Sequence, residues 1–203
     1  MNRPTTAILA GVALTCACTP GPGTEPPAEQ QRPYVSGDLQ IARWGAGPIR
    51  PWTFFESPRI RDLFPKAVVK DDVVLISHDE TMAVITVEQD GAKLFEIDDG
   101  LGNVPGTDDP EIGKVRAVGG PVRGPGGETL GQSWIAARFD LSQCEIGSDE
   151  DANKVICARA GDGQVTYIFT VPGWWSEEVP SLSLLRAKGY LSQIVWTPPP
   201  HHR

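Results

Sequence analysis

The chain has 203 residues, and its 18 basic and 26 acidic residues give a formal charge of −8. This balance argues against a nucleic-acid-binding protein, because phosphate groups are bound by clustered lysine and arginine. Glycine and proline supply 22 and 19 residues, while 40% of the chain is hydrophobic. The composition therefore excludes a wholly disordered chain and predicts a turn-rich fold of one or two domains.

The N-terminal segment has the pattern of a bacterial lipoprotein signal peptide. Residues 7–17 form a mostly small or apolar run after a positive charge, and this run is shorter than the roughly 20 residues needed to span a bilayer. Ala17 precedes Cys18, which predicts that residues 1–17 are removed and that Cys18 is acylated. Acylation at Cys16 and an ordinary secretion signal with incidental cysteines remain the alternatives.

Residues 18–37 predict an extended tether. Prolines recur through this segment without an apolar period, and proline at this density gives a stiff, extended spacer. Thr19, rather than aspartate, follows Cys18, which by the sorting rule of bacterial lipoproteins points to the outer membrane. We therefore expect one folded domain, residues 38–197, attached to the periplasmic side of the outer membrane by its lipid, with residues 198–203 as a free tail.

The first half of the domain predicts one short helix followed by strands. Ser57 and Pro58 are typical of an N-cap and a first helical residue, which places a helix at 59–64. The dipeptide Asp90-Gly91 between two β-type runs is the strongest short signal for a hairpin. Runs of β-branched and aromatic residues predict strands at 73–76, 82–87, 92–97 and 114–118.

The second half predicts two further helices and three strands. The segment 98–127 is rich in glycine, proline and aspartate, and we interpret it as a surface insertion around one strand. Apolar spacing predicts a helix at 132–140, and Ser181 as N-cap with Gly189 after the last turn predicts another at 181–188. Strands are expected at 155–159, 164–170 and 190–196. The predicted fold is α+β, a mainly antiparallel sheet built from hairpins with two or three short helices.

Cys144 and Cys157 are the cysteines left after the signal segment. The compartment of an exported chain is oxidising, and such a pair then predicts a disulfide. Closing a loop of this length stabilises a fold by about 3 kcal/mol. A redox-active pair favours the closer Cys-x-x-Cys spacing and a zinc site needs four ligands, so these alternatives fit the spacing poorly.

An ordered set of blocks follows the two cysteines. The blocks are Val165-Thr166-Tyr167-Ile168-Phe169, Gly173-Trp174, Pro180-Ser181 and Ile194-Val195-Trp196. Together with the lipoprotein signal, they resemble the YfeY-like family of small outer-membrane lipoproteins, over roughly residues 82–197. The resemblance implies a shared fold, a disulfide and outer-membrane placement. It also implies a family regulated by the envelope-stress sigma factor E, but no biochemical activity. The stretch 105–127 is longer here than in the family pattern.

Several sequence patterns resemble catalytic, metal-binding or phosphate-binding sites, but each has a simpler structural explanation. Ser77-His78-Asp79-Glu80 holds the residue types of a catalytic triad, but neighbours in sequence do not converge as a triad does, so we expect a polar turn. Residues 149–154 begin like a calcium loop without its glycine and glutamate. The calcium-loop interpretation of these residues therefore fails. Asp98-Asp99 and residues 108–111 could supply oxygen ligands to a weak calcium site, but we expect them to form a solvated acidic face. The glycine-rich stretch 119–131 lacks a phosphate-binding motif. We expect no catalytic residue, no metal and no cofactor.

Trp174 and Trp175 are the candidates for partner binding. Adjacent side chains of an extended chain point to opposite sides, so one can enter the core while the other reaches the surface, where a tryptophan can anchor a partner or stack on a sugar. The alternative packs both against the sheet or the next helix. Three functions stay open: a non-enzymatic envelope interaction or structural module, which we favour; a periplasmic glycan or small-ligand binder; and a periplasmic hydrolase or hydrolase inhibitor.

Overall fold

The computed structural model describes residues 39–77, 80–100 and 111–200, all within one compact unit, Pro33–Arg203. The predicted signal peptide and tether, including Cys16 and Cys18, lie outside the described residues, as do His78 and Asp79. Within the described part of the chain, no helix has the length and apolar character that a membrane crossing requires.

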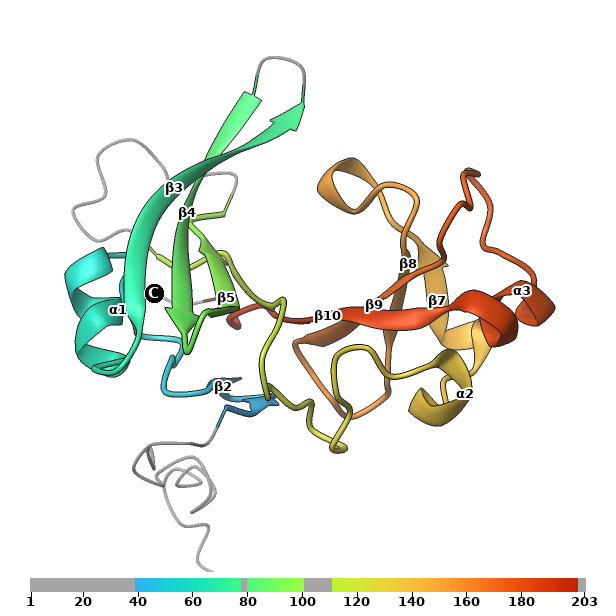
Figure 1. The fold of residues 1–203 in the computed structure, drawn as a ribbon, viewed down its shortest axis with the longest axis horizontal. Coiled ribbons are helices and arrows are strands. Elements are labelled where there is room, and N and C mark those ends of the chain that lie inside the picture. The colour runs from blue at the N-terminus through green and yellow to red at the C-terminus, as the bar shows by residue number, and fades with distance from the viewer. Residues whose placement is uncertain (1–38, 78–79, 101–110, 201–203) are drawn as a thin grey trace, which may run out of the picture. The chain divides into compact units, whose positions relative to one another are not determined.

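One eight-stranded sheet dominates the domain (Figure 1). From edge to edge its strands are β3 (Val68–Ser77), β4 (Glu80–Gln89), β5 (Ala92–Asp98), β6 (Lys114–Ala117), β10 (Tyr190–Trp196), β9 (Val165–Thr170), β8 (Val155–Ala158) and β7 (Cys144–Ile146). Every neighbouring pair is antiparallel. Two short strands, β1 (Ile41–Ala42) and β2 (Gly45–Ala46), form a second sheet. The predicted α+β class with a mainly antiparallel sheet is confirmed.

The hairpin of β4 and β5 forms where the Asp-Gly dipeptide predicts it. Asp90 and Gly91 both adopt positive φ, 53° and 77°. A tight two-residue hairpin turn requires this conformation at both positions, and Asp followed by Gly tolerates it best. The local sequence therefore sets the pairing of these two strands.

The segment 98–127 contributes to the centre of the sheet. The strand predicted at 114–118 is confirmed as β6, which pairs with β5 on one side and with β10 on the other. Val115 and Val122 are fully buried. The expected surface insertion around this strand is therefore wrong at Val122, whose side chain belongs to the core, and β6 itself joins the two halves of the sheet.

Helix α1 (Ser57–Leu63) begins two residues earlier than predicted. Glu56 occupies the N-cap position, and Ser57, the expected cap, lies inside the helix. The Ser57 hydroxyl instead donates a hydrogen bond to the Asp71 carboxylate on β3. This bond ties the start of the helix to the edge strand of the sheet.

Helix α2 (Trp134–Ala137) is shorter than the predicted helix at 132–140. Arg138 ends it by adopting a left-handed conformation, with φ 57°. Two 3₁₀ turns, η2 (Leu141–Gln143) and η3 (Asp149–Asp151), follow along the chain.

Helix α3 (Leu182–Lys188) matches its predicted position. The Ser181 hydroxyl oxygen accepts a hydrogen bond from the Leu184 N–H at 3.3 Å, as an N-cap does. Gly189 follows the helix as expected, but its φ is −69°, so it does not adopt the left-handed conformation usual for a glycine at this place. A Cβ at position 189 would lie 2.7 Å from the Leu185 carbonyl oxygen, so the glycine is needed there for close backbone approach.

Aromatic side chains form the core on the β9 side of the sheet. Trp134 and Phe139 pack against Phe169, with ring centroids 4.8 and 5.3 Å apart. Tyr167, Ile168 and Phe169 are all buried although they alternate between the two faces of β9. This strand is therefore covered on both sides.

Candidate functional site

A cavity of about 190 Å³ opens on the sheet between the β3–β4 hairpin and η3. β3 and β4 continue past the end of β5, because Val84 already pairs with Asp98, the last residue of that strand. We call residues 73–77 and 80–83, which pair only with each other, the ribbon. Figure 1 shows the ribbon curving away from the remaining strands. The cavity is lined by Val74, Leu75, Met82, Val84, Glu96, Asp98, Arg116, Glu150, Asp151, Lys154 and Gln193.

Arg116 is the centre of a buried ionic cluster in the floor of the cavity. Its Nη1 donates to both carboxylate oxygens of Asp151, at 3.1 and 3.2 Å, and to Oε1 of Gln193 at 3.1 Å. Its Nη2 donates to the Glu150 carboxylate. The Arg116 side chain is only 8% exposed, and a charge this buried persists only when it is paired and hydrogen-bonded.

Two lysines complete the Arg116 cluster. The Nζ of Lys114 lies 2.9 Å from Glu150, and the Nζ of Lys154 lies 3.0 Å from Asp151. Three cations therefore share two carboxylates. The cluster joins β6 to η3, so the floor of the cavity is fixed by contacts across the sheet.

Asp98 adds a further buried carboxyl group beside this cluster. Burial raises its pKa, while the Gly100 N–H, which donates to Oδ1 at 3.1 Å, and the Arg116 charge lower it. A Cβ at Gly113 would lie 2.5 Å from the same oxygen, so the backbone packs closely around this side chain. The Gly113 N–H also donates to the Asp98 carbonyl oxygen at 2.8 Å, so Asp98 contacts both ends of the connection between β5 and β6.

The ribbon gives the cavity an apolar wall and the surface an apolar edge. Within the ribbon, Met82 is buried beside the cavity, whereas Val73 and Leu75 are 63% and 70% exposed, and Leu75 also lines the cavity. β3 is an edge strand, and in the described ranges no other strand pairs with its outer side. Long edge strands with exposed apolar residues are the surfaces on which a further strand can pair.

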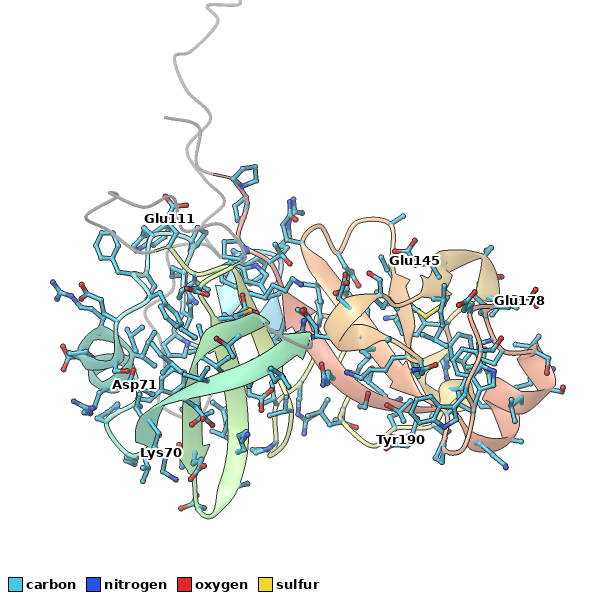
Figure 2. The ribbon with its side chains drawn as sticks, turned by 90° about the horizontal axis from the view of Figure 1, so that it is seen from above. Lys70, Asp71, Glu111, Glu145, Glu178 and Tyr190 are labelled. Carbon is cyan, nitrogen blue, oxygen red and sulfur yellow. A yellow bond between two sulfur atoms is a disulfide. The ribbon has the colours of Figure 1, made fainter. Side chains whose placement is uncertain are left out.

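The predicted disulfide between Cys144 and Cys157 is confirmed. The two residues lie directly opposite each other on β7 and β8, with Cα atoms 4.1 Å apart. Figure 2 shows the opposite edges of the sheet, with Lys70 and Asp71 on β3 and Glu145 on β7. The disulfide thus stabilises the edge farthest from the ribbon.

The structure separates the two candidate tryptophans. Trp174 is partly buried against the core, whereas Trp175 is 80% exposed. Neither lines the cavity beside the ribbon. Their partner binding stays a prediction, on a surface separate from this cavity.

Sequence reasoning missed the residues that form the cavity floor. Asp98 is 3% exposed, so the expected solvated acidic face is wrong at this position; residues 108–110 lie outside the described residues. Asp151, at 6% exposed, is buried as well. Arg116 and its partners lie 34 to 77 positions apart in the chain, and no local spacing signals such contacts. The available hint was an arginine inside a predicted strand, since a charge there needs partners from elsewhere.

These features define an α+β domain with one eight-stranded antiparallel sheet. A disulfide links the two strands at one edge of this sheet, and the ribbon projects at the other edge. Its fold is similar to the crystal structure of the uncharacterized protein YfeY from Escherichia coli, with a TM-score of 0.60 and 15% sequence identity, over 78% of this chain and 99% of that one. The chain therefore has a YfeY-like fold, as the resemblance in its sequence implies. No family model and no curated protein matches the chain.

Proposed function

We propose that this chain is an outer-membrane lipoprotein whose domain is a non-enzymatic interaction module on the periplasmic side. Support for the anchor comes from the lipoprotein-type segment ending at Cys18 and the proline-rich residues after it. The disulfide between Cys144 and Cys157 fits an oxidising compartment. The envelope-stress regulation described for the family is carried over as part of the same proposal.

The main support for this interaction is the exposed edge of the ribbon. The two edge strands of the sheet differ in length and exposure. β7 has 3 residues and is linked to its neighbour β8 by the disulfide. β3 has 10 residues and exposes the side chains of Val73 and Leu75. Short edges resist pairing and long apolar ones invite it. The partner is an extended segment of an envelope protein that adds a strand to β3, with main-chain hydrogen bonds giving affinity and alternate side chains giving specificity.

The cavity supports binding rather than bond cleavage. Arg116, Glu150 and Asp151 satisfy one another, which gives a rigid floor, and the ribbon supplies an apolar wall. This combination also favours a second candidate, a small-ligand or glycan site in the same cavity. A thermal-shift series with envelope sugars tests that candidate, because a ligand that binds the folded state raises the melting temperature.

The anchor is tested by metabolic labelling with a fatty-acid analogue and by fractionation of membranes. Cys18→Ser should abolish acylation and release the domain from the outer membrane, while Cys16→Ser should leave both unchanged. The proposal requires this asymmetry. Full acylation of Cys18→Ser, or the absence of label from the unmodified chain, would overturn the anchor at Cys18.

A further inference from the structure

A second cavity lies between α2 and α3, outside the site described above. Figure 1 shows these two helices beside each other at one end of the sheet. The cavity has a volume of about 390 Å³, within the roughly 300–1,000 Å³ typical of small-molecule sites. Its apolar lining is Trp134, Ile135, Phe139, Leu141 and Leu182.

Two arginines, Arg138 and Arg186, also line this cavity. In the part of the chain that the structure describes, neither guanidinium has a hydrogen bond or an ion pair. By contrast, Arg116 and Arg159 are each paired with buried carboxylates. Arg138 and Arg186 thus bring two unpaired guanidiniums to one cavity of a chain whose formal charge is −8.

Asp140 is the acidic residue in the lining, and its carboxylate is already engaged. Its Oδ1 accepts hydrogen bonds from the Ser142 N–H at 2.9 Å and the Ser142 hydroxyl at 2.8 Å. The charges on the lining therefore sum to 2 − 1 = +1. The local field attracts an anion, although the whole chain repels one.

The backbone at Arg138 adds an independent observation. Four non-glycine residues among those described have positive φ, and three of them, Asp90, Asp149 and Asn153, are of the types that tolerate this conformation. Arginine is not among these types, and glycine is the favoured residue at a left-handed helix end. Strain of this kind persists where a side chain is needed for function, and here it places an arginine on the cavity.

We infer that the α2–α3 cavity binds a single-chain anionic amphiphile, a monomer with a carboxylate or phosphate-monoester head and an unbranched apolar tail. Guanidinium groups pair with carboxylate and phosphate through two parallel hydrogen bonds, which suits Arg138 and Arg186 to the head group. The apolar lining receives the tail. Ile135, which is 62% exposed, is covered when the tail is bound, and this burial supplies the hydrophobic part of the affinity.

The test is isothermal titration calorimetry with decanoate and decyl phosphate at concentrations where both are monomeric. The full chain is used with Cys16→Ser and Cys18→Ser, so that no attached acyl chain competes. We expect one saturable site for both probes and no binding of decyltrimethylammonium, which has the same tail and the opposite charge. Inorganic phosphate alone should bind at least tenfold more weakly than decyl phosphate.

Three variants distinguish this site from non-specific binding. Arg138→Gly removes the guanidinium and relieves the left-handed backbone, so a folding defect is not expected, and it should weaken decanoate binding at least tenfold. Arg186→Gln, on an exposed face of α3, should do the same. Arg61→Gln, an exposed arginine on α1, is the matched control and should bind as the unmodified chain does.

Three results would overturn the inference. The first is equal affinity in Arg138→Gly, Arg186→Gln and the unmodified chain. The second is binding of inorganic phosphate as tight as that of decyl phosphate, which would leave the apolar lining without a role. The third is arginine-dependent binding of anionic phosphatidylglycerol vesicles with none of monomeric decanoate, which would assign the two arginines to a membrane surface instead.

Discussion

Arg138 occupies a conformation that few non-glycine residues adopt. Its Cβ approaches the backbone in the left-handed region, which costs about 1 kcal/mol relative to glycine. We expect Arg138→Gly to be more stable by about 1 kcal/mol and to raise the melting temperature by about 2–4 °C. Calorimetry or urea unfolding measures the difference. A variant that is less stable than the unmodified chain would show that the Arg138 side chain contributes packing that outweighs the strain.

Asp98 should make the stability depend on pH in a defined direction. Its pKa is raised above the ordinary value of 3.8, first of all by burial, so the folded state holds this proton more tightly than the unfolded state. Its contribution to stability is present below pH 3.8 and is lost as the pH rises through the folded-state pKa. Asp98→Asn stays neutral, so its stability relative to the unmodified chain should increase across that interval.

Asp140→Asn is the matched control for the Asp98 measurement. Hydrogen bonds from Ser142 lower the pKa of Asp140, so its contribution is present above pH 3.8 and is lost as the pH falls. The two variants should therefore differ from the unmodified chain with opposite pH slopes. Equal slopes would contradict the assignment of burial as the dominant influence on Asp98. Denaturant unfolding at a series of pH values measures both.

At the scale of elements, the disulfide closes the β7–β8 hairpin at the edge of the sheet. Cys144 and Cys157 are 13 positions apart, and the cross-link removes conformational freedom mainly from the unfolded chain. Replacing both by serine should lower the free energy of unfolding by about 3 kcal/mol. Urea unfolding of the two forms measures the loss. A loss below about 1 kcal/mol would mean that the hairpin keeps its order without the covalent bond.

The sequence predicted the elements that depend on neighbouring residues. It did not predict the contacts that depend on residues far apart in the chain. The β4–β5 hairpin follows from Asp90-Gly91, and α3 follows from Ser181, because each signal acts within a few residues. The Arg116 cluster depends on Asp151 and Gln193, which lie 35 and 77 positions away. Only the assembled sheet brings these side chains together. The sequence therefore shows that they are charged but does not predict that they are buried.

The end of α2 illustrates a third case, in which a periodic signal continues past the helix. Apolar residues keep helical spacing through Leu141, yet the helix ends at Ala137. Arg138 then turns the chain so that Phe139 packs on Tyr167, with ring centroids 4.7 Å apart. Phe139 is thus buried without being helical, and tertiary packing has overridden the local preference.

On the scale of the whole molecule, net charge and local charge give different information. The formal charge of −8 disfavours contact with the phosphates of nucleic acid. Arg138 and Arg186 nevertheless give one cavity a local excess of positive charge. The ribbon offers an exposed apolar edge at another place in the same domain. The proposed protein contact and the proposed amphiphile binding therefore involve two separate surfaces.

The measurement that tests the interaction module most directly is photo-crosslinking in intact cells. A photoreactive residue is placed at Leu75 on β3 or, as the control, at the exposed Glu145 on β7, the opposite edge of the sheet (Figure 2). The account predicts one dominant protein adduct from position 75, its loss on the additional change Val73→Lys, and no such adduct from position 145. No protein adduct from position 75, or the same adducts from both edges, would contradict the central claim that the ribbon binds an envelope protein.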